Sequence, residues 1–440
     1  MAESIEIPDC HYPKEPILVS PITPTPTHTL YLSNLDDQKF LRFTSKYLYV
    51  FRKSIAVETL AASLSRVLVE YYPLAGRVRA GAGNDGEKLE VDCNGEGALL
   101  VEAHVDLTAD RFLQGGRKPN RSWRKLLYRV EEQSFVDTPP LVIQVTRLSC
   151  GGMILCTAIN HCVCDAIAAA QFLQAWGLFT SKPDAHLPMN AFHDRSILKP
   201  REPLRIEFSH PEFSSPPPQE NLSDFILSQP LAPVSVTFTG AQVLRLKKQC
   251  EPSVKCTSFE VLAWHIWRSW IKALEPPPSL RTKLLFSMSV RKKLEPELPN
   301  GYFGNGFIMA CAETSVEELI SSNSNCAIFK SLQEAKNRVD DGYVRSMIDL
   351  LEERRVKPDM SSTLVISPLT KVGFEELDFG EGKPLHMGYL VSEIYCLLLP
   401  VVGDLNAFTM LMSVPQGIAE RFHQYCTEDL DDAKNVDAEN

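Results

Sequence analysis

The sequence lacks both an excess of basic residues and a long apolar run. Its 440 residues include 45 Lys and Arg against 55 Asp and Glu, a formal net charge of -10. No basic cluster offsets that balance, which argues against a nucleic-acid partner. No apolar run reaches the roughly 18 residues that a bilayer-spanning helix needs, and the N-terminus has no charged, apolar leader. These absences predict a soluble, cytoplasmic protein without a membrane span.

The twelve cysteines lack the spacing of a metal site or a disulfide framework. Cys162 and Cys164 are separated by one residue, whereas thiolate metal sites usually place two between them. We therefore predict no bound metal and reduced, mostly buried thiols. Their closeness to His161 leaves a Cys/His nucleophile as an alternative. Against it, only alternate side chains of an extended segment share a face, and neither thiol has an evident third partner.

The chain does have the apolar residues, 44% of the total, to build the cores of two domains of about 200 residues each. Helical spacing of apolar residues predicts a helix from Val57 to Tyr71 that stops at Pro73. Thr257 and Glu260 have the spacing of a capping box at the start of a second main helix. Strands are predicted at residues 284–290, 390–400 and 408–414.

A proline-rich segment divides the sequence. It lies between residues 181 and 222, shows little periodicity and includes the proline triplet at 216–218. Such composition is typical of an extended crossover. We expect an N-terminal domain at 1–180, the crossover at 181–222 and a C-terminal domain at 223–440.

The segment from Asn160 to Asp165 has the strongest functional signal. Two apolar strands, at residues 141–148 and 153–158, precede it, and a helix is predicted over 166–176. A histidine in such a turn can be fixed in orientation yet open to a ligand, which suits His161 to act as a general base. Two structural alternatives remain open. His161 can be a core residue, and Asp165 can simply cap the helix.

Five segments together resemble the BAHD acyltransferases, plant enzymes that move an acyl group from a CoA thioester to an alcohol or amine. His161 and Asp165 match the family's HxxxD motif, and the other segments follow in the family's order. They are YLSNLDDQ at residues 31–38, YYPLAGR at 71–77, PELPNGYFGNG ending at Gly306, and LDFGEGKP at 377–384. The residues that carry the last two motifs are Tyr302, Phe303, Gly304, Asn305, Asp378, Phe379, Gly380 and Gly382.

The resemblance implies a fold. It is a two-domain α/β architecture similar to chloramphenicol acetyltransferase, with a mixed β-sheet flanked by helices in each domain and an active-site channel between the domains. Part of the second half would return to the first domain's sheet.

The resemblance also implies a reaction. Acyl-CoA would be a co-substrate, with no bound cofactor, and the acyl group would pass directly to a hydroxyl or amine with His161 as base. Asp165 would pair with Arg291 and support the loop, although Arg291 can also be a surface residue beside two lysines. A monomer with small-molecule substrates is expected.

The sequence also departs from the family's pattern. Glu381 stands where DFGWG has Trp, and Ala166 and Ser289 replace a usual Gly and Asp. Pro368 and Leu369 occupy the region where many members carry a Ser or Thr and a Trp beside the acyl group. The sequence therefore assigns no residue as the oxyanion donor.

Two functional hypotheses follow from the whole pattern. The first is an acyltransferase most similar to the cuticle-associated "defective in cuticular ridges" branch, acting in cuticle-lipid or specialised metabolism. The second is a non-catalytic accessory or binding protein in wax or lipid elongation, because some members keep the fold without evident transferase chemistry. The sequence names neither the acyl donor nor the acceptor.

Overall fold

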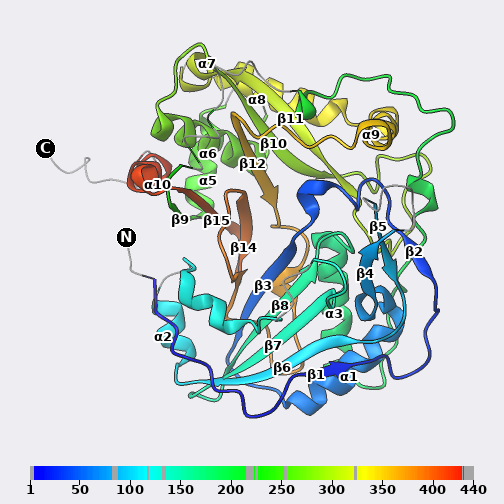
Figure 1. Cartoon of the computed structure of the whole chain (residues 1–440). Helices are drawn as coiled ribbons and strands as arrows, with labels where there is room; N and C mark the ends of the chain where they lie inside the picture. The colour runs from blue at the N-terminus through cyan, green and yellow to red at the C-terminus, as the bar shows by residue number, and fades with distance from the viewer. Residues whose placement is uncertain are drawn as a thin grey trace, which may run out of the picture.

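The computed structural model of the chain consists of two six-stranded mixed sheets, each covered by helices, and a small three-stranded sheet. It describes residues 4–81, 88–115, 118–130, 135–214, 222, 226, 228–250, 255–321, 325–428 and 430. Figure 1 shows the two large sheets in separate lobes, with β6, β7 and β8 in one and β10, β11 and β12 in the other. The expected α/β class, with mixed sheets flanked by helices, is therefore confirmed.

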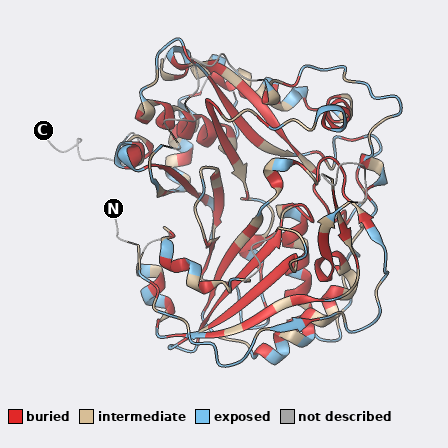
Figure 2. Cartoon of the chain, in the orientation of Figure 1, coloured by how far each residue is buried: buried red, intermediate tan, exposed pale blue. Residues whose placement is uncertain are grey.

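The first sheet has the strand order β1-β6-β7-β8-β3-β13. The strand bounds are Ile17–Val19 (β1), Thr44–Phe51 (β3), Ala98–Val105 (β6), Leu141–Leu148 (β7), Met153–Asn160 (β8) and His386–Tyr389 (β13). Every residue of β8 is buried, as its apolar composition predicts. Figure 2 shows the same burial in the central strands of both sheets, while the outer faces of the helices are exposed.

Helices cover both faces of this sheet. On one face, α1 (Val57–Glu70) and α3 (Ala166–Ser181) bury an apolar cluster that includes Leu60, Leu64 and Trp176. On the other face, α2 (Ala109–Gln114) and the 3-10 helix η3 (Arg121–Leu126) pack against Leu48 and Val50. The helices predicted at 57–71 and 166–176 are confirmed, with α3 longer than expected.

The second sheet has the order β11-β10-β12-β14-β15-β9. Its strands are Leu231–Phe238 (β9), Arg281–Ser289 (β10), Phe307–Ser315 (β11), Thr363–Pro368 (β12), Cys396–Val401 (β14) and Asp404–Pro415 (β15). Its helices are α5 (Gly240–Lys248), α6 (Ser258–Leu274), α7 (Val316–Ile320), α8 (Asn325–Arg338), α9 (Asp341–Arg354) and α10 (Ala419–Thr427). The capping box at Thr257 and Glu260 forms as predicted and starts α6.

One strand connects the two lobes. Strand β13 comes from the second half of the chain but pairs antiparallel with β3 of the first sheet, from His386 opposite Val50 to Tyr389 opposite Tyr47. The single strand predicted at 390–400 is therefore wrong in its first half. Residues 390–395 connect the first sheet to the second, and strand β14 of the second sheet begins only at Cys396. An apolar run marks burial, whereas a strand also needs a hydrogen-bonding neighbour.

The remaining elements are short. The small sheet contains β2 (Thr29–Tyr31), β4 (Arg77–Ala80) and β5 (Leu89–Asp92). The other 3-10 helices are η1 (Lys39–Leu41), η2 (Tyr72–Ala75), η4 (Ser196–Leu198), η5 (Pro211–Phe213), η8 (Phe374–Glu376) and η9 (Gln416–Ile418). Among the described helices, none combines the length and apolar character required to cross a bilayer.

Candidate active site

A cavity of about 720 Å³ lies between the two large sheets. Its walls come from β3 and the segment before it, the start of α3, strands β10, β11 and β12, and the passage between β13 and β14. The lining is mainly apolar and aromatic, with Phe40, Phe43, Phe307, Met288 and Met309 among it. A space of this size and composition can hold an extended organic ligand.

His161 lies on the wall of this cavity, directly after β8. Its main-chain N–H donates to the Phe43 carbonyl, which continues the pairing of β8 with β3 by one residue. Its ring packs against Phe43 and Phe307, with ring centroids 5.0 and 5.9 Å away. Burial lowers the pKa of the imidazole below 6.5, and the Asp165 charge and the Asn305 amide offset only part of that effect. The ring is therefore mainly neutral at pH 7 and can accept a proton.

The structure brings Asp165 and Arg291 together. Arg291 donates from both terminal nitrogens to the two carboxylate oxygens of Asp165, at 2.7 and 2.9 Å. The exposed fraction is 6% for the Asp165 side chain and 16% for that of Arg291. Asp165 also caps α3 by accepting from Ala168 N and accepts from Gly306 N, both at 3.0 Å. Burial alone would raise the pKa of this carboxyl, but the Arg291 guanidinium and these donors hold the pKa below 3.8. The carboxylate is thus both a helix cap and half of a bidentate ion pair.

The YFGNG segment is held between two arginines. A Cβ at Gly306 would lie 2.8 Å from Nη1 of Arg291, and one at Gly304 would lie 2.7 Å from the Tyr302 hydroxyl and 3.1 Å from Nε of Arg195. A side chain at Gly306 would therefore displace the Arg291 guanidinium, and one at Gly304 would displace Tyr302. Asn305, between them, is fully buried and donates to the His161 carbonyl at 2.8 Å.

The first two residues of that segment are core. Tyr302 and Phe303 are buried, and Phe303 packs edge-on against Tyr71 with centroids 5.0 Å apart. Neither residue lines the cavity.

The DFGEG segment lies away from the cavity lining. Asp378 accepts from Gly380 N and Gly382 N at 2.7 and 3.0 Å, which closes a tight loop, and Phe379 packs edge-on against Trp176. Glu381 forms an exposed ion pair with Lys53 at 2.8 Å. The replacement of Trp by Glu is thus a surface change.

A hydroxyl lies directly beside Pro368 and Leu369. Ser367, the preceding residue of β12, is on the cavity wall next to both, and the sequence analysis did not name it. Other hydroxyl-bearing residues on the wall are Thr44, Ser45, Tyr47, Ser287, Ser289, Tyr389 and Tyr395.

The two thiols near His161 are poor nucleophiles. Cys162 and Cys164 are buried, and burial raises the pKa of both well above the ordinary value. A protonated thiol is unreactive, which argues against the Cys/His alternative. Within the described part of the chain, no group of three His, Cys, Asp or Glu is placed to hold a metal ion.

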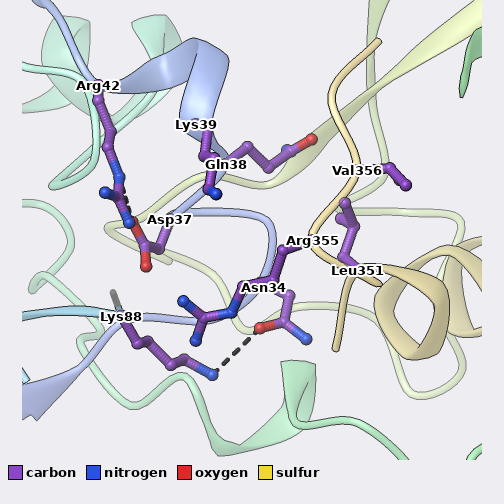
Figure 3. Close-up of a pocket in the computed structure, with 9 residues that line it drawn as sticks. All are labelled: Asn34, Asp37, Gln38, Lys39, Arg42, Lys88, Leu351, Arg355 and Val356. Carbon is purple, nitrogen blue, oxygen red and sulfur yellow. Dashed lines mark hydrogen bonds and ion pairs between the residues drawn. The ribbon is translucent and has the colours of Figure 1, made fainter. Parts of the chain in front are cut away.

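A second, much smaller cavity of about 20 Å³ borders the first through Lys39 and Arg42. Figure 3 shows how the side chains around it come from residues 34–42, from Lys88 just before β5, and from the end of α9 and the residues after it, with Asp37 directed toward Arg42. Asp36 and Asp37, adjacent in the YLSNLDDQ segment, thus have different partners, because Asp36 is fully buried against Arg195. No pattern in the sequence predicted a role for either acid.

Comparisons with known proteins agree with this geometry. A model described as the transferase family matches residues 14–424. The chain is 36% identical over 93% of its length to omega-hydroxypalmitate O-feruloyl transferase of Arabidopsis thaliana, covering 91% of that protein. It is 34% identical over 94% of its length to fatty alcohol:caffeoyl-CoA acyltransferase of the same plant, covering 97% of it. The crystal structure of vinorine synthase superposes with a TM-score of 0.74 at 18% identity, covering 96% of this chain and 99% of that one.

Two mixed sheets with a histidine-bearing cavity between them, in a chain with these relatives, define an acyl-CoA-dependent acyltransferase with a chloramphenicol-acetyltransferase-like fold. Within that class, the chain belongs to the BAHD acyltransferases.

Proposed function

We propose that His161 is the general base of a direct acyl transfer from acyl-CoA to a hydroxyl-bearing acceptor. The observation that carries this proposal is the position of the imidazole, on the wall of a cavity shared by both sheets and on a loop held by the Asp165–Arg291 ion pair; burial there lowers its pKa. A thioester is already activated, so the acceptor lacks only nucleophilicity. As the new C–O bond forms, the acceptor proton passes to the imidazole. As the C–S bond breaks, the imidazole returns that proton to the CoA thiolate.

We also propose the class of substrates and the setting. The apolar, aromatic lining favours an acyl or acceptor group with a large hydrocarbon part, and the two Arabidopsis relatives are named for hydroxycinnamoyl donors and long-chain alcohols. A role in cuticle lipids or related specialised metabolism fits that chemistry. Cys93, Cys156, Cys162 and Cys164 are free, buried thiols, which suits a reducing compartment such as the cytoplasm. We further propose that the protein acts as a monomer, with acyl-CoA as co-substrate and no resident cofactor.

The test is release of free thiol from feruloyl-CoA or caffeoyl-CoA in the presence of ω-hydroxypalmitate or a fatty alcohol. His161→Ala should lower turnover by about a hundredfold to ten-thousandfold, the usual contribution of a positioned base. Its melting temperature should change little, because the ring faces a cavity and does not fill a core.

His265 offers a matched control, since it is a buried histidine of α6 whose Nε2 lies 2.9 Å from the Cys426 carbonyl, outside the cavity lining. His265→Ala should lose stability and keep its turnover. Full turnover in His161→Ala would remove the base assignment. A stable acyl adduct on Cys162 or Cys164, seen by mass spectrometry with acyl-CoA alone, would replace direct transfer by an acyl-enzyme. Lack of turnover by the parent with every donor and acceptor would favour the accessory role.

A further inference from the structure

A second ion pair, fully buried, lies beneath the His161 loop. Arg195 comes from the crossover just before η4, and Asp36 comes from the YLSNLDDQ segment; Nη1 and Oδ2 are 3.3 Å apart, and both side chains have an exposed fraction of 0%. Asp36 is fixed from its own side, because the main-chain N–H and hydroxyl of Ser33 both donate to Oδ2, at 2.9 and 2.5 Å. A charged pair withdrawn this far from water needs such additional donors and acceptors.

The pair reaches the loop through two carbonyls. Nη2 of Arg195 donates to the Val163 carbonyl at 2.7 Å and to the Phe303 carbonyl at 3.2 Å. Asn305 extends the contact, since its Nδ2 donates to Asp36 Oδ1 at 3.0 Å and to the His161 carbonyl at 2.8 Å. The His161 and Val163 carbonyls, on either side of Cys162, therefore accept hydrogen bonds from Asn305 and Arg195. These contacts are separate from the Asp165–Arg291 pair.

We propose that Arg195 is a positioning residue for the acyl transfer, acting through the main chain of the His161 loop with Asp36 as its counter-charge. This inference rests on the proposed role of His161. A guanidinium is suited to the task, because Nη2 donates to two carbonyls while Nη1 places the charge beside the Asp36 carboxylate. An ammonium keeps the charge beside Asp36 but cannot place a second nitrogen against both carbonyls with the same geometry. With lysine at position 195, the loop would stay fixed at Asp165 and become less constrained near His161.

Arg195→Lys is the informative change, since it leaves no buried carboxylate without a cation. We expect kcat to fall by about ten- to a hundredfold, because small displacements of a catalytic group cost about that much. The KM values for acyl-CoA and acceptor should stay within about threefold, because Arg195 lies outside the cavity lining and affects the reacting geometry alone. Asn305→Ala removes the amide contact to His161 without altering a charge, and should show the same split between kcat and KM.

Arg201 provides the matched control. It lies in the same crossover, and its Nε donates to Oδ2 of Asp349 at 2.7 Å, a carboxylate of α9 that is 1% exposed. Arg201→Lys therefore disturbs an arginine–aspartate pair that has no contact with the His161 loop. It should lower the melting temperature as Arg195→Lys does, and leave kcat unchanged.

The outcomes separate the two proposals. A normal kcat in Arg195→Lys and in Asn305→Ala, with His161→Ala inactive, would overturn the positioning role alone. Equal losses of kcat in the Arg195 and Arg201 variants would also overturn it, by showing a general effect of stability. Full turnover in His161→Ala would overturn the proposed base, whatever the arginine variants do. If Arg195→Lys does not fold, the kcat of Asn305→Ala is compared with that of Arg201→Lys. A loss of kcat in Asn305→Ala alone supports the positioning role, and equal values overturn it.

Discussion

At the scale of single residues, the protonation state of His161 is set by competition between burial and nearby charge. The ring lies between Phe43 and Phe307, and this apolar surrounding disfavours the imidazolium ion. Asp165 works in the opposite direction but is already paired with Arg291. The outcome is a pKa below 6.5, which keeps the base form available at neutral pH.

This balance predicts the pH dependence of catalysis. Because the protonated imidazole cannot accept a proton, kcat/KM should fall as the pH drops through the His161 pKa, with a midpoint below 6.5. Asp165→Asn removes a charge that raises this pKa and leaves the Arg291 cation in place, so the midpoint should move to a lower pH. Initial rates between about pH 5 and 8 measure both. A parent midpoint at or above 6.5, or an upward shift in the variant, would contradict this account.

At the scale of elements, Asp165 joins the start of α3 to the connection between β10 and β11. Its carboxylate accepts from Ala168 N of α3, from Gly306 N just before β11 and from Arg291 just after β10. Since the pKa of the folded carboxyl is below 3.8, these contacts contribute stability above about pH 4 and lose it as the pH falls through the folded pKa. One side chain thus fixes three segments around the His161 loop.

A double-variant cycle tests this junction. Asp165→Ala or Arg291→Ala alone leaves a poorly solvated charge, so each should lower stability by about 3 kcal/mol and also lower turnover. The two residues act as a unit, so the double variant should lose much less than the sum of the single variants. Chemical unfolding and thiol release are the measurements. Additive losses would show that Asp165 is only a helix cap and that Arg291 acts independently.

At the scale of the whole molecule, the first sheet is complete only with a strand from the far end of the chain. Strand β13 covers the edge of β3, and the segment leading to it adds Phe374, Leu377 and Phe379 to the first sheet's core. An exposed edge with unsatisfied hydrogen-bonding groups and missing core residues favours aggregation.

We therefore expect residues 1–222 produced alone to aggregate or to unfold without cooperativity, although they contain His161 and Asp165. Size-exclusion chromatography and thermal unfolding of the fragment, beside the full chain, measure this. Co-expression with residues 223–440 should recover soluble protein if β13 supplies the missing strand. A monomeric fragment that unfolds cooperatively by itself would contradict the expectation.

The sequence by itself determined the features that depend on neighbours along the chain. Apolar spacing predicted α1, and the spacing of Thr257 and Glu260 predicted the start of α6. Two apolar strands separated by a turn predicted that His161 follows directly after β8. These patterns succeed because helix periodicity, strand burial and capping involve residues a few positions apart. The order of the motifs indicated the family, and the resemblance to that family implied that Asp165 pairs with Arg291.

Only the tertiary structure decided which distant residues meet. Asp36, Arg195 and Asn305 come from three separate segments and have no local pattern in common, yet they converge beneath one loop. The misplaced strand at 390–400 has the same origin, because the passage of the chain between two sheets leaves no mark in an apolar run. Local spacing records the face of one element, whereas the partner of that face is chosen by long-range packing and by the need to pair every buried charge.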